Sequence, residues 1–189
     1  MRALACAPLL LCASAAAAQS LEQLSVPDLV LPGSDGKSHR LPELVSAAPL
    51  TVFVFFARGC PCLAVHDESL RTLANDYAAR GVKVWMIDSE AGSSLEEDQQ
   101  QAQARGYPFP ILRDEHGALI DALGVRFASG TVVFDRRGRA HYRGGIDASR
   151  RSAAPPEGAY LRQALDALLS GREPANAEPK ALGCYLRRE

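Results

Sequence analysis

Two cysteines and a histidine stand close together in the chain, and their types and spacing suit thiol or metal chemistry. Pro61 separates Cys60 from Cys62, and His66 follows four residues after Cys62. The thiolate is the reactive form of cysteine, both as a nucleophile and as a metal ligand. Two such thiols can exchange with a disulfide, while a Cys-x-Cys-x₃-His set of two thiolates and an imidazole suits Cu(I) or Zn(II).

The position of Cys60 in the chain predicts a reactive thiolate. Leu50–Phe56 is a continuous apolar run of strand length, and a turn at Arg58-Gly59 follows it. A helix is predicted over 61–80, because proline suits the first helical position. Cys60 then lies at or near the N-cap, where free backbone N–H groups and the helix dipole stabilise a thiolate more than a thiol.

Helical spacing aligns Cys62 with a row of side chains further along this helix, so we expect it to face the core and to be less exposed than Cys60. The row at steps of three and four residues comprises His66, Leu70, Leu73 and Tyr77. Cys62 is then either a resolving thiol for Cys60 or a small apolar residue that fills the core. A disulfide between residues i and i+2 is geometrically tight, which makes it easier to reduce.

His66 has two interpretations on the same helix. One turn beyond Cys62, it can hold a thiolate as an ion pair, carry a proton, or complete the metal set with both cysteines. Otherwise it is a half-buried histidine bonded to a nearby carboxylate such as Asp67, or to backbone.

The first 18 residues have the pattern of a secretory signal peptide. Arg2 precedes an apolar run over Ala3–Leu11, and Ala16–Ala18 offers a cleavage site. The run is too short to span a bilayer. A lipoprotein signal that ends at Cys12 is the alternative, but the bulky residue before it argues against lipidation. We therefore expect cleavage near Ala18 and a periplasmic or secreted protein.

Removal of this segment also removes Cys6 and Cys12 and leaves three cysteines, of which one is always unpaired. The third, Cys184, lies in a polar tail that becomes apolar near its end. If the tail folds back over the sheet, Cys184 is a third redox thiol. If it does not, Cys184 is a tail thiol that has no partner or that forms dimers.

The remaining pattern predicts alternating strands and helices. A hairpin-like lead-in over 19–48 precedes the elements that the apolar periodicity predicts. These are strands at 50–56 and 82–88, helices at 61–80, 94–105, 118–123 and 156–169, and a hairpin of 131–135 with 139–143. A parallel pair joined by a helix, with an added antiparallel hairpin, gives an α/β fold with a mixed sheet. We expect a signal peptide at 1–18, one domain at 19–171 and a tail at 172–189.

Composition excludes several classes of protein. The chain of 189 residues has 21 Lys and Arg against 22 Asp and Glu, so no strong field is available to hold nucleic acid. The 47% of apolar residues and 23% of charged residues are ordinary for a globular domain and exclude a polytopic membrane protein.

The chain resembles the thioredoxin-fold redoxin family, which includes alkyl hydroperoxide reductase and thiol-specific antioxidant proteins. The segments that carry the resemblance are Val26–Leu31 with Asp35-Gly36-Lys37, the apolar strand before Cys60, Ile87-Asp88, Tyr107–Asp114, and the hairpin Val132–Asp135 with Tyr142–Gly144. The resemblance implies a three-layer α/β/α sandwich with Cys60 at the nucleophile position.

Three departures from the family pattern bear on the activity. Leu63 occupies the place of the second cysteine in Cys-x-x-Cys, and the stretch 128–131 has no proline where thioredoxin-like oxidoreductases carry a cis-proline. The Pro-x₃-Thr/Ser-x₂-Cys pattern of peroxiredoxins is also missing before Cys60, which argues against efficient peroxide reduction. Copper-carrying members of the fold use two thiolates and a histidine and also lack the proline.

These observations favour an exported thiol–disulfide oxidoreductase with antioxidant or disulfide-exchange activity. Cys60 would attack a protein or small-molecule disulfide, Cys62 would resolve the mixed disulfide, and His66 would tune the thiolates. No cofactor is needed, because the electrons travel in sulfur. The alternative is a copper or zinc protein that uses the same three residues, and a third possibility is a redox-inactive binding module.

Overall fold

The computed structural model describes residues 20–149 and 158–186. The expected signal peptide, the alternative lipid site at Cys12 and the start of the helix expected at 156 lie outside these residues. In the described part, no helix combines the length and the apolar character needed to cross a membrane.

A five-stranded mixed sheet forms the centre of the molecule, in the order β5-β4-β3-β6-β7. The central strand β3 (Leu50–Phe56) pairs in parallel with β4 (Val82–Asp88), which pairs in parallel with β5 (Ile111–Arg113). On the other side β3 pairs antiparallel with β6 (Gly130–Asp135), which pairs antiparallel with β7 (Ala140–Gly145). Every residue of β3 is buried, as expected for a strand covered on both faces. The prediction of a mixed α/β sheet is confirmed.

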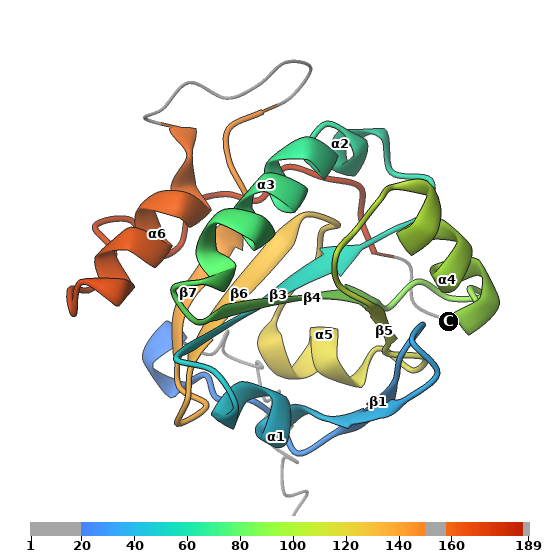
Figure 1. Cartoon of the computed structure of the whole chain (residues 1–189), viewed down its shortest axis with the longest axis horizontal. Coiled ribbons are helices and arrows are strands. Elements are labelled where there is room, and N and C mark those ends of the chain that lie inside the picture. Colours follow the sequence, from blue (N-terminus) through green and yellow to red (C-terminus); the bar gives the residue numbers. More distant parts are fainter. Residues whose placement is uncertain (1–19, 150–157, 187–189) are drawn as a thin grey trace, which may run out of the picture.

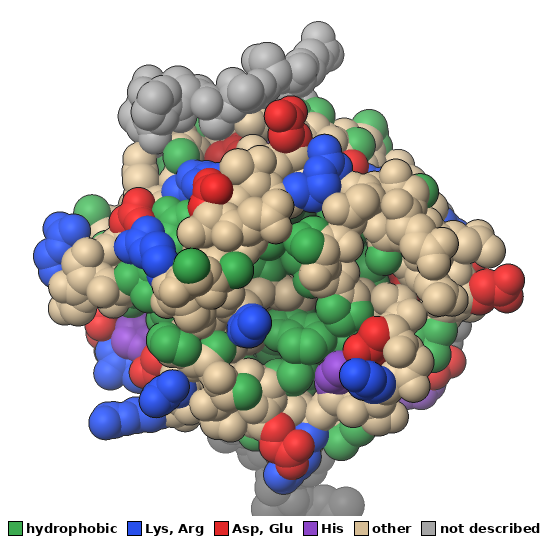
Figure 2. Space-filling model, viewed as in Figure 1, with side chains coloured by type: hydrophobic (Ala, Val, Ile, Leu, Met, Phe, Trp, Pro, Cys, Tyr) green, Lys and Arg blue, Asp and Glu red, His purple; other side chains and the backbone are tan. Residues whose placement is uncertain are grey.

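Helices cover both faces of this sheet, which gives three layers (Figure 1). One face carries α2 (Pro61–Ala64), α3 (Asp67–Ala78) and α6 (Tyr160–Leu169), and the other carries α1 (Leu41–Ser46) and α5 (Ala118–Leu123). The lead-in contains the short helix η1 (Leu21–Gln23) and the hairpin of β1 (Val30–Pro32) with β2 (Ser38–Arg40), and α4 (Leu95–Ala104) lies beside β5. On the face drawn in Figure 2, acidic and basic side chains are interspersed, as the near-neutral charge predicts.

The prediction of one continuous helix over 61–80 is wrong. This segment is broken into α2 and α3 at Val65 and His66, where the backbone N–H of His66 bonds the carbonyl of Leu63 at 2.8 Å. This bond spans three residues and ends the first turn. Asp67 and Glu68 then supply the acidic first turn that favours a new helix start.

The C-terminal tail folds back across the molecule, as one of the two alternatives from the sequence predicted. It first follows the edge strand β7, where Arg143 N bonds the carbonyl of Ala177 at 2.9 Å and Gly145 N bonds that of Pro179 at 3.2 Å. Its end then runs beside the segment before β6. There Ala128 N donates to the Cys184 carbonyl at 2.9 Å, and Leu186 N donates to the Arg126 carbonyl at 3.0 Å.

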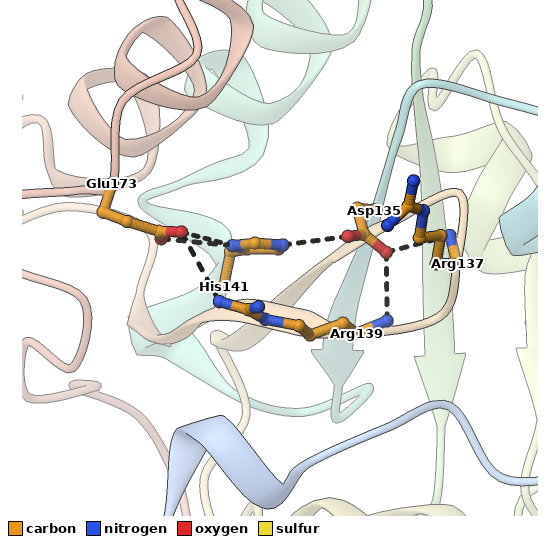
Figure 3. Close-up of polar contacts among 5 residues, drawn as sticks. All are labelled: Asp135, Arg137, Arg139, His141 and Glu173. Atoms are coloured by element: carbon orange, nitrogen blue, oxygen red, sulfur yellow. Dashed lines mark hydrogen bonds and ion pairs between the residues drawn. The ribbon is translucent and has the colours of Figure 1, made fainter.

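A charged cluster fixes the point where the tail leaves α6. The His141 ring on β7 lies between two carboxylates, with Nε2 3.0 Å from Asp135 Oδ2 and Nδ1 3.1 Å from Glu173 Oε2 (Figure 3). Arg139 lies 3.6 Å from the same glutamate. The hairpin is thereby tied to the first residues of the tail.

Asp98 is the buried residue of α4, whose other residues are exposed or half-buried. Its side chain is 1% exposed and faces Asp88 at the end of β4. Burial, followed by the nearby charge of Asp88 and a hydrogen bond with it, raises the pKa of Asp98 to about 8. Two carboxyl groups in one buried site can share a proton, which explains why one of them stays neutral.

We predict that Gly183→Ala detaches the end of the tail. A Cβ at this position would stand 1.7 Å from the carbonyl oxygen of Ala128, which is far inside van der Waals contact. Overpacking of this kind costs about 1–3 kcal/mol where the backbone cannot move. We expect the end of the tail to move away from Ala128 instead. Hydrogen exchange at the amides of Ala128 and Leu186 should accelerate. Gly59→Ala is the control, because a Cβ there meets no atom within 4 Å; unchanged protection in Gly183→Ala would contradict the prediction.

We predict that Asp98→Asn stabilises the fold at alkaline pH. The pKa of Asp98 is above its ordinary value of 3.8 in the folded state. The folded protein therefore holds more protons than the unfolded chain between about pH 4 and 8, and the free energy of unfolding falls as the pH rises through that window. The variant lacks this pH-dependent loss of stability. The difference between its free energy of unfolding and that of the parent protein, measured by urea denaturation, should therefore grow up to about pH 8 and exceed ~1 kcal/mol. The exposed Glu96→Gln is the control, and an advantage that does not depend on pH would refute the assignment.

Candidate active site

Cys60 lies where the central strand meets the first helix, as the sequence predicted. It is the N-cap residue of α2, with an extended backbone (φ −79°, ψ 109°), and its amide bonds the carbonyl of Ala57 at 3.1 Å. The residue is 2% exposed. Because α2 is a single turn, individual N–H groups rather than a long helix act on the sulfur.

The tail brings Cys184 directly to this sulfur. The backbone N–H of Cys184 donates to Cys60 Sγ at 3.3 Å, across 124 positions in the chain. Ser129 supports the approach, because its hydroxyl donates to the Leu182 carbonyl at 2.7 Å. The sequence left open whether Cys184 has a partner, and the structure shows that it contacts Cys60.

The surroundings of Cys60 favour its thiolate. Burial alone would raise the pKa of the Cys60 thiol, but a hydrogen bond from the Cys184 thiol, the backbone N–H of Cys184 and the N–H groups of Leu63 and Cys62 outweigh it and lower the pKa. The contact has the opposite effect on the pKa of Cys184. Burial, together with the proximity of Cys60, raises the pKa of the Cys184 thiol to about 11. One thiol therefore ionises while the other stays protonated and donates to it.

The expected order of exposure of Cys60 and Cys62 is wrong. Cys60 is buried, while Cys62 is half-buried. The neighbouring Leu63 is 0% exposed and fills the core-facing position that spacing had given to Cys62. The cause is the break after α2, which ends the helical register on which the row of side chains depended.

His66 points to a carboxylate that sequence spacing did not indicate. Its Nδ1 lies 3.1 Å from Oδ1 of Asp147, a residue that follows β7, and both side chains are buried. The ring N–H is not aligned for a hydrogen bond, so the contact is an ion-pair approach. Burial opposes ionisation of Asp147, but the contact with His66 and hydrogen bonds from Ser149 lower its pKa. Asp67, the partner that we had expected, instead pairs with Arg105 at 2.9 Å.

The three residues of the metal alternative are not assembled as a ligand set. Within residues 20–149 and 158–186, no group of three or more His, Cys, Asp and Glu side chains is arranged to hold a metal ion. His66, which lies between α2 and α3, faces Asp147. The copper or zinc alternative therefore gains no support from this part of the chain.

Arg58 and Ser129 are two neighbours of the site whose contacts lie away from the family's sequence pattern. Arg58 forms an ion pair with Glu97 on α4, and its backbone N–H bonds Glu90, so the guanidinium is engaged away from the sulfur. At the position of the missing proline, Ser129 has a positive φ of 71°, and its amide bonds the Phe55 carbonyl at 2.8 Å. No side-chain periodicity could have indicated this serine, although Gly130 after it signals a turn.

A cavity of about 340 Å³ opens beside the end of the tail. Its lining is mainly apolar and comprises Ile120, Val125, Arg126, Tyr185 and Leu186. Two of these residues directly follow Cys184 in the chain. Tyr185 is 62% exposed, and its ring packs edge-to-face on Phe127.

Comparison with known proteins relates this geometry to a family. The family model described as the AhpC/TSA family matches residues 23–143. A curated relative, peroxiredoxin bcp1 of Schizosaccharomyces pombe, is 27% identical over 122 residues, which is 62% of this chain. The match spans 56% of the length of that relative.

Solved structures agree with the fold. An uncharacterized conserved protein from Geobacillus kaustophilus has a TM-score of 0.80 and 33% identity, over 87% of this chain and 90% of that one. A thioredoxin-like protein from Aeropyrum pernix has a TM-score of 0.55 and 20% identity, over 64% and 83% of the two chains. The expected thioredoxin-like three-layer fold is confirmed.

We predict that Cys184→Ala raises the pKa of Cys60. The variant loses the thiol that donates to the Cys60 sulfur but keeps the backbone N–H. The rate of alkylation by iodoacetamide, followed against pH and located by peptide mass, reports the Cys60 thiolate. Cys62→Ala is the matched control, because it keeps the backbone N–H through which Cys62 lowers the pKa of Cys60. An unshifted profile in Cys184→Ala would show that the tail thiol does not stabilise the thiolate.

Proposed function

We propose that this chain, which belongs to the AhpC/TSA family, is a thiol-dependent oxidoreductase whose nucleophile is Cys60. The observation that carries the proposal is the hydrogen bond from the Cys184 backbone to the Cys60 sulfur at the start of α2. A sulfur that accepts such donors is stabilised as the thiolate, and the thiolate is the attacking form.

The first substrate class in this proposal is a disulfide. The Cys60 thiolate attacks one sulfur of R–S–S–R′, a bond forms between Cys60 and R–S, and R′–S⁻ leaves and takes up a proton. A second thiol of the chain then attacks the Cys60 sulfur, which releases R–SH and leaves an internal disulfide. The substrate gains two electrons, and the chain loses them.

Two thiols compete for the second step. Cys62 is the resolving thiol that the sequence favours, and it shares a turn with Cys60. The contact between Cys184 and Cys60 supports Cys184 instead, because its backbone already touches the sulfur that must be attacked. A bond between residues i and i+2 would also be tight, whereas the tail can adjust.

A hydroperoxide is the second candidate substrate. The 2% exposure of Cys60 favours a small oxidant over a protein disulfide, which would reach the sulfur only after the tail moves. The relation to peroxiredoxin bcp1 points the same way. In that reaction the thiolate takes one oxygen to give Cys60–SOH and an alcohol, and a thiol of the chain then condenses with it and releases water.

Export and the absence of a cofactor belong to the same proposal. The signal-like pattern of residues 1–18 supports delivery to the periplasm or the exterior, where disulfides persist. All three described cysteines are free thiols, and sulfur alone accounts for the transfer of electrons. Small thiols or dithiol proteins would then supply the electrons that return the chain to its reduced form.

We expect Cys60→Ser to lower activity by about 10³-fold or more, because a hydroxyl at this position is far less nucleophilic than a thiolate. Insulin-disulfide reduction with dithiothreitol and consumption of cumene hydroperoxide distinguish the two substrate classes. His66→Gln is the comparison variant, since His66 contacts Asp147. Full activity of Cys60→Ser on both substrates would refute the nucleophile.

A further inference from the structure

We infer that the three thiols form a relay, in which the disulfide first made between Cys60 and Cys184 passes to Cys62 and Cys184 and leaves Cys60 reduced. This inference rests on the proposed function, which supplies the first disulfide. It adds a route by which the oxidised pair moves from a buried sulfur to two more accessible ones.

All three cysteines meet at one place. Cys184 N lies 3.3 Å from Cys60 Sγ, and Cys62 is in the turn that begins at Cys60. The backbone N–H of Cys62 also faces the Cys184 thiol. Cys184 therefore contacts Cys60 and lies next to the turn that holds Cys62, which is what a carrier of the disulfide requires.

Burial determines which of the two disulfides an external reductant can reach. Cys60 is 2% exposed, whereas Cys62 and Cys184 are both half-buried. An external reductant must place its own sulfur in line with the bond that it breaks, so a disulfide that involves Cys60 is shielded on one side. The pair of Cys62 and Cys184 is formed by two half-buried residues, so an external reductant reaches it more easily.

The chemical step is a balanced exchange. The Cys62 thiolate attacks Cys184 Sγ, a bond forms between these sulfurs, the bond from Cys184 to Cys60 breaks, and Cys60 leaves as a thiolate. The proton of Cys62 goes to solvent, and no electrons enter or leave the chain. A thiol of lower pKa leaves faster, and the donors around Cys60 lower its pKa. Those donors stabilise the product in which Cys60 is the free thiolate.

The test uses the full chain with Cys6→Ser and Cys12→Ser, so that only three thiols remain. The reduced protein is treated with one equivalent of oxidised glutathione, quenched with acid at increasing times, alkylated and mapped by peptide mass. We expect glutathione on Cys60 at early times. At equilibrium we expect Cys60 to be the alkylated residue, in about tenfold excess over Cys62, because the donors around its sulfur favour its free thiolate.

Cys62→Ser should stop the relay at the first disulfide. In this variant Cys60 and Cys184 stay joined, no thiol is alkylated, and dithiothreitol should reduce the protein about tenfold more slowly than the three-thiol parent. A parent protein in which Cys62 or Cys184 is the free thiol at equilibrium overturns the relay while the proposed function stands. Glutathione that first appears on Cys62 or Cys184 overturns the proposed function itself.

Discussion

The chemistry that we propose for this protein depends on a hydrogen bond between the C-terminal tail and the start of α2. The backbone N–H of Cys184 reaches the Cys60 sulfur at 3.3 Å, and the tail that supplies it also covers that sulfur. The same few atoms therefore stabilise the thiolate and restrict access to it. The N–H groups of Leu63 and Cys62 in α2 add to the first effect, but a single helical turn offers few such groups.

The close approach of the tail depends on details of the backbone at the start of β6. Gly183 leaves room for the carbonyl of Ala128, and Ser129, with φ of 71°, turns its hydroxyl to the Leu182 carbonyl. Ala128 N then bonds the Cys184 carbonyl. A proline at position 129 would lack both the hydroxyl that bonds the tail and the N–H that bonds the Phe55 carbonyl. The missing proline that the sequence marked as a departure therefore fits a segment that pairs with the chain's own tail.

Local patterns predicted what depends on local forces. The apolar run of β3, the N-cap position of Cys60 and the bounds of α5 follow from neighbouring residues, and the structure agrees with each of them. The break at His66 was missed because the prediction assigned one continuous helix and did not treat Asp67 and Glu68 as a new helix start. The carboxylate that His66 faces, Asp147, is 81 positions away and lies outside any local pattern. The exposure of Cys62 was misjudged as well, since its assigned face assumed an unbroken helix. The contact of Cys184 is longer in range still, and no periodicity encodes it.

A stabilised thiolate has two opposite effects on its own reactivity. Lowering the pKa of a thiol increases the fraction that is ionised, but it also weakens each thiolate as a nucleophile and makes it a better leaving group. Burial under the tail reduces the rate of attack on large substrates further. The arrangement around Cys60 therefore favours its release from a disulfide more than its attack on one. A third thiol is useful in such a site, because it can accept the disulfide and return the buried sulfur to its reduced form.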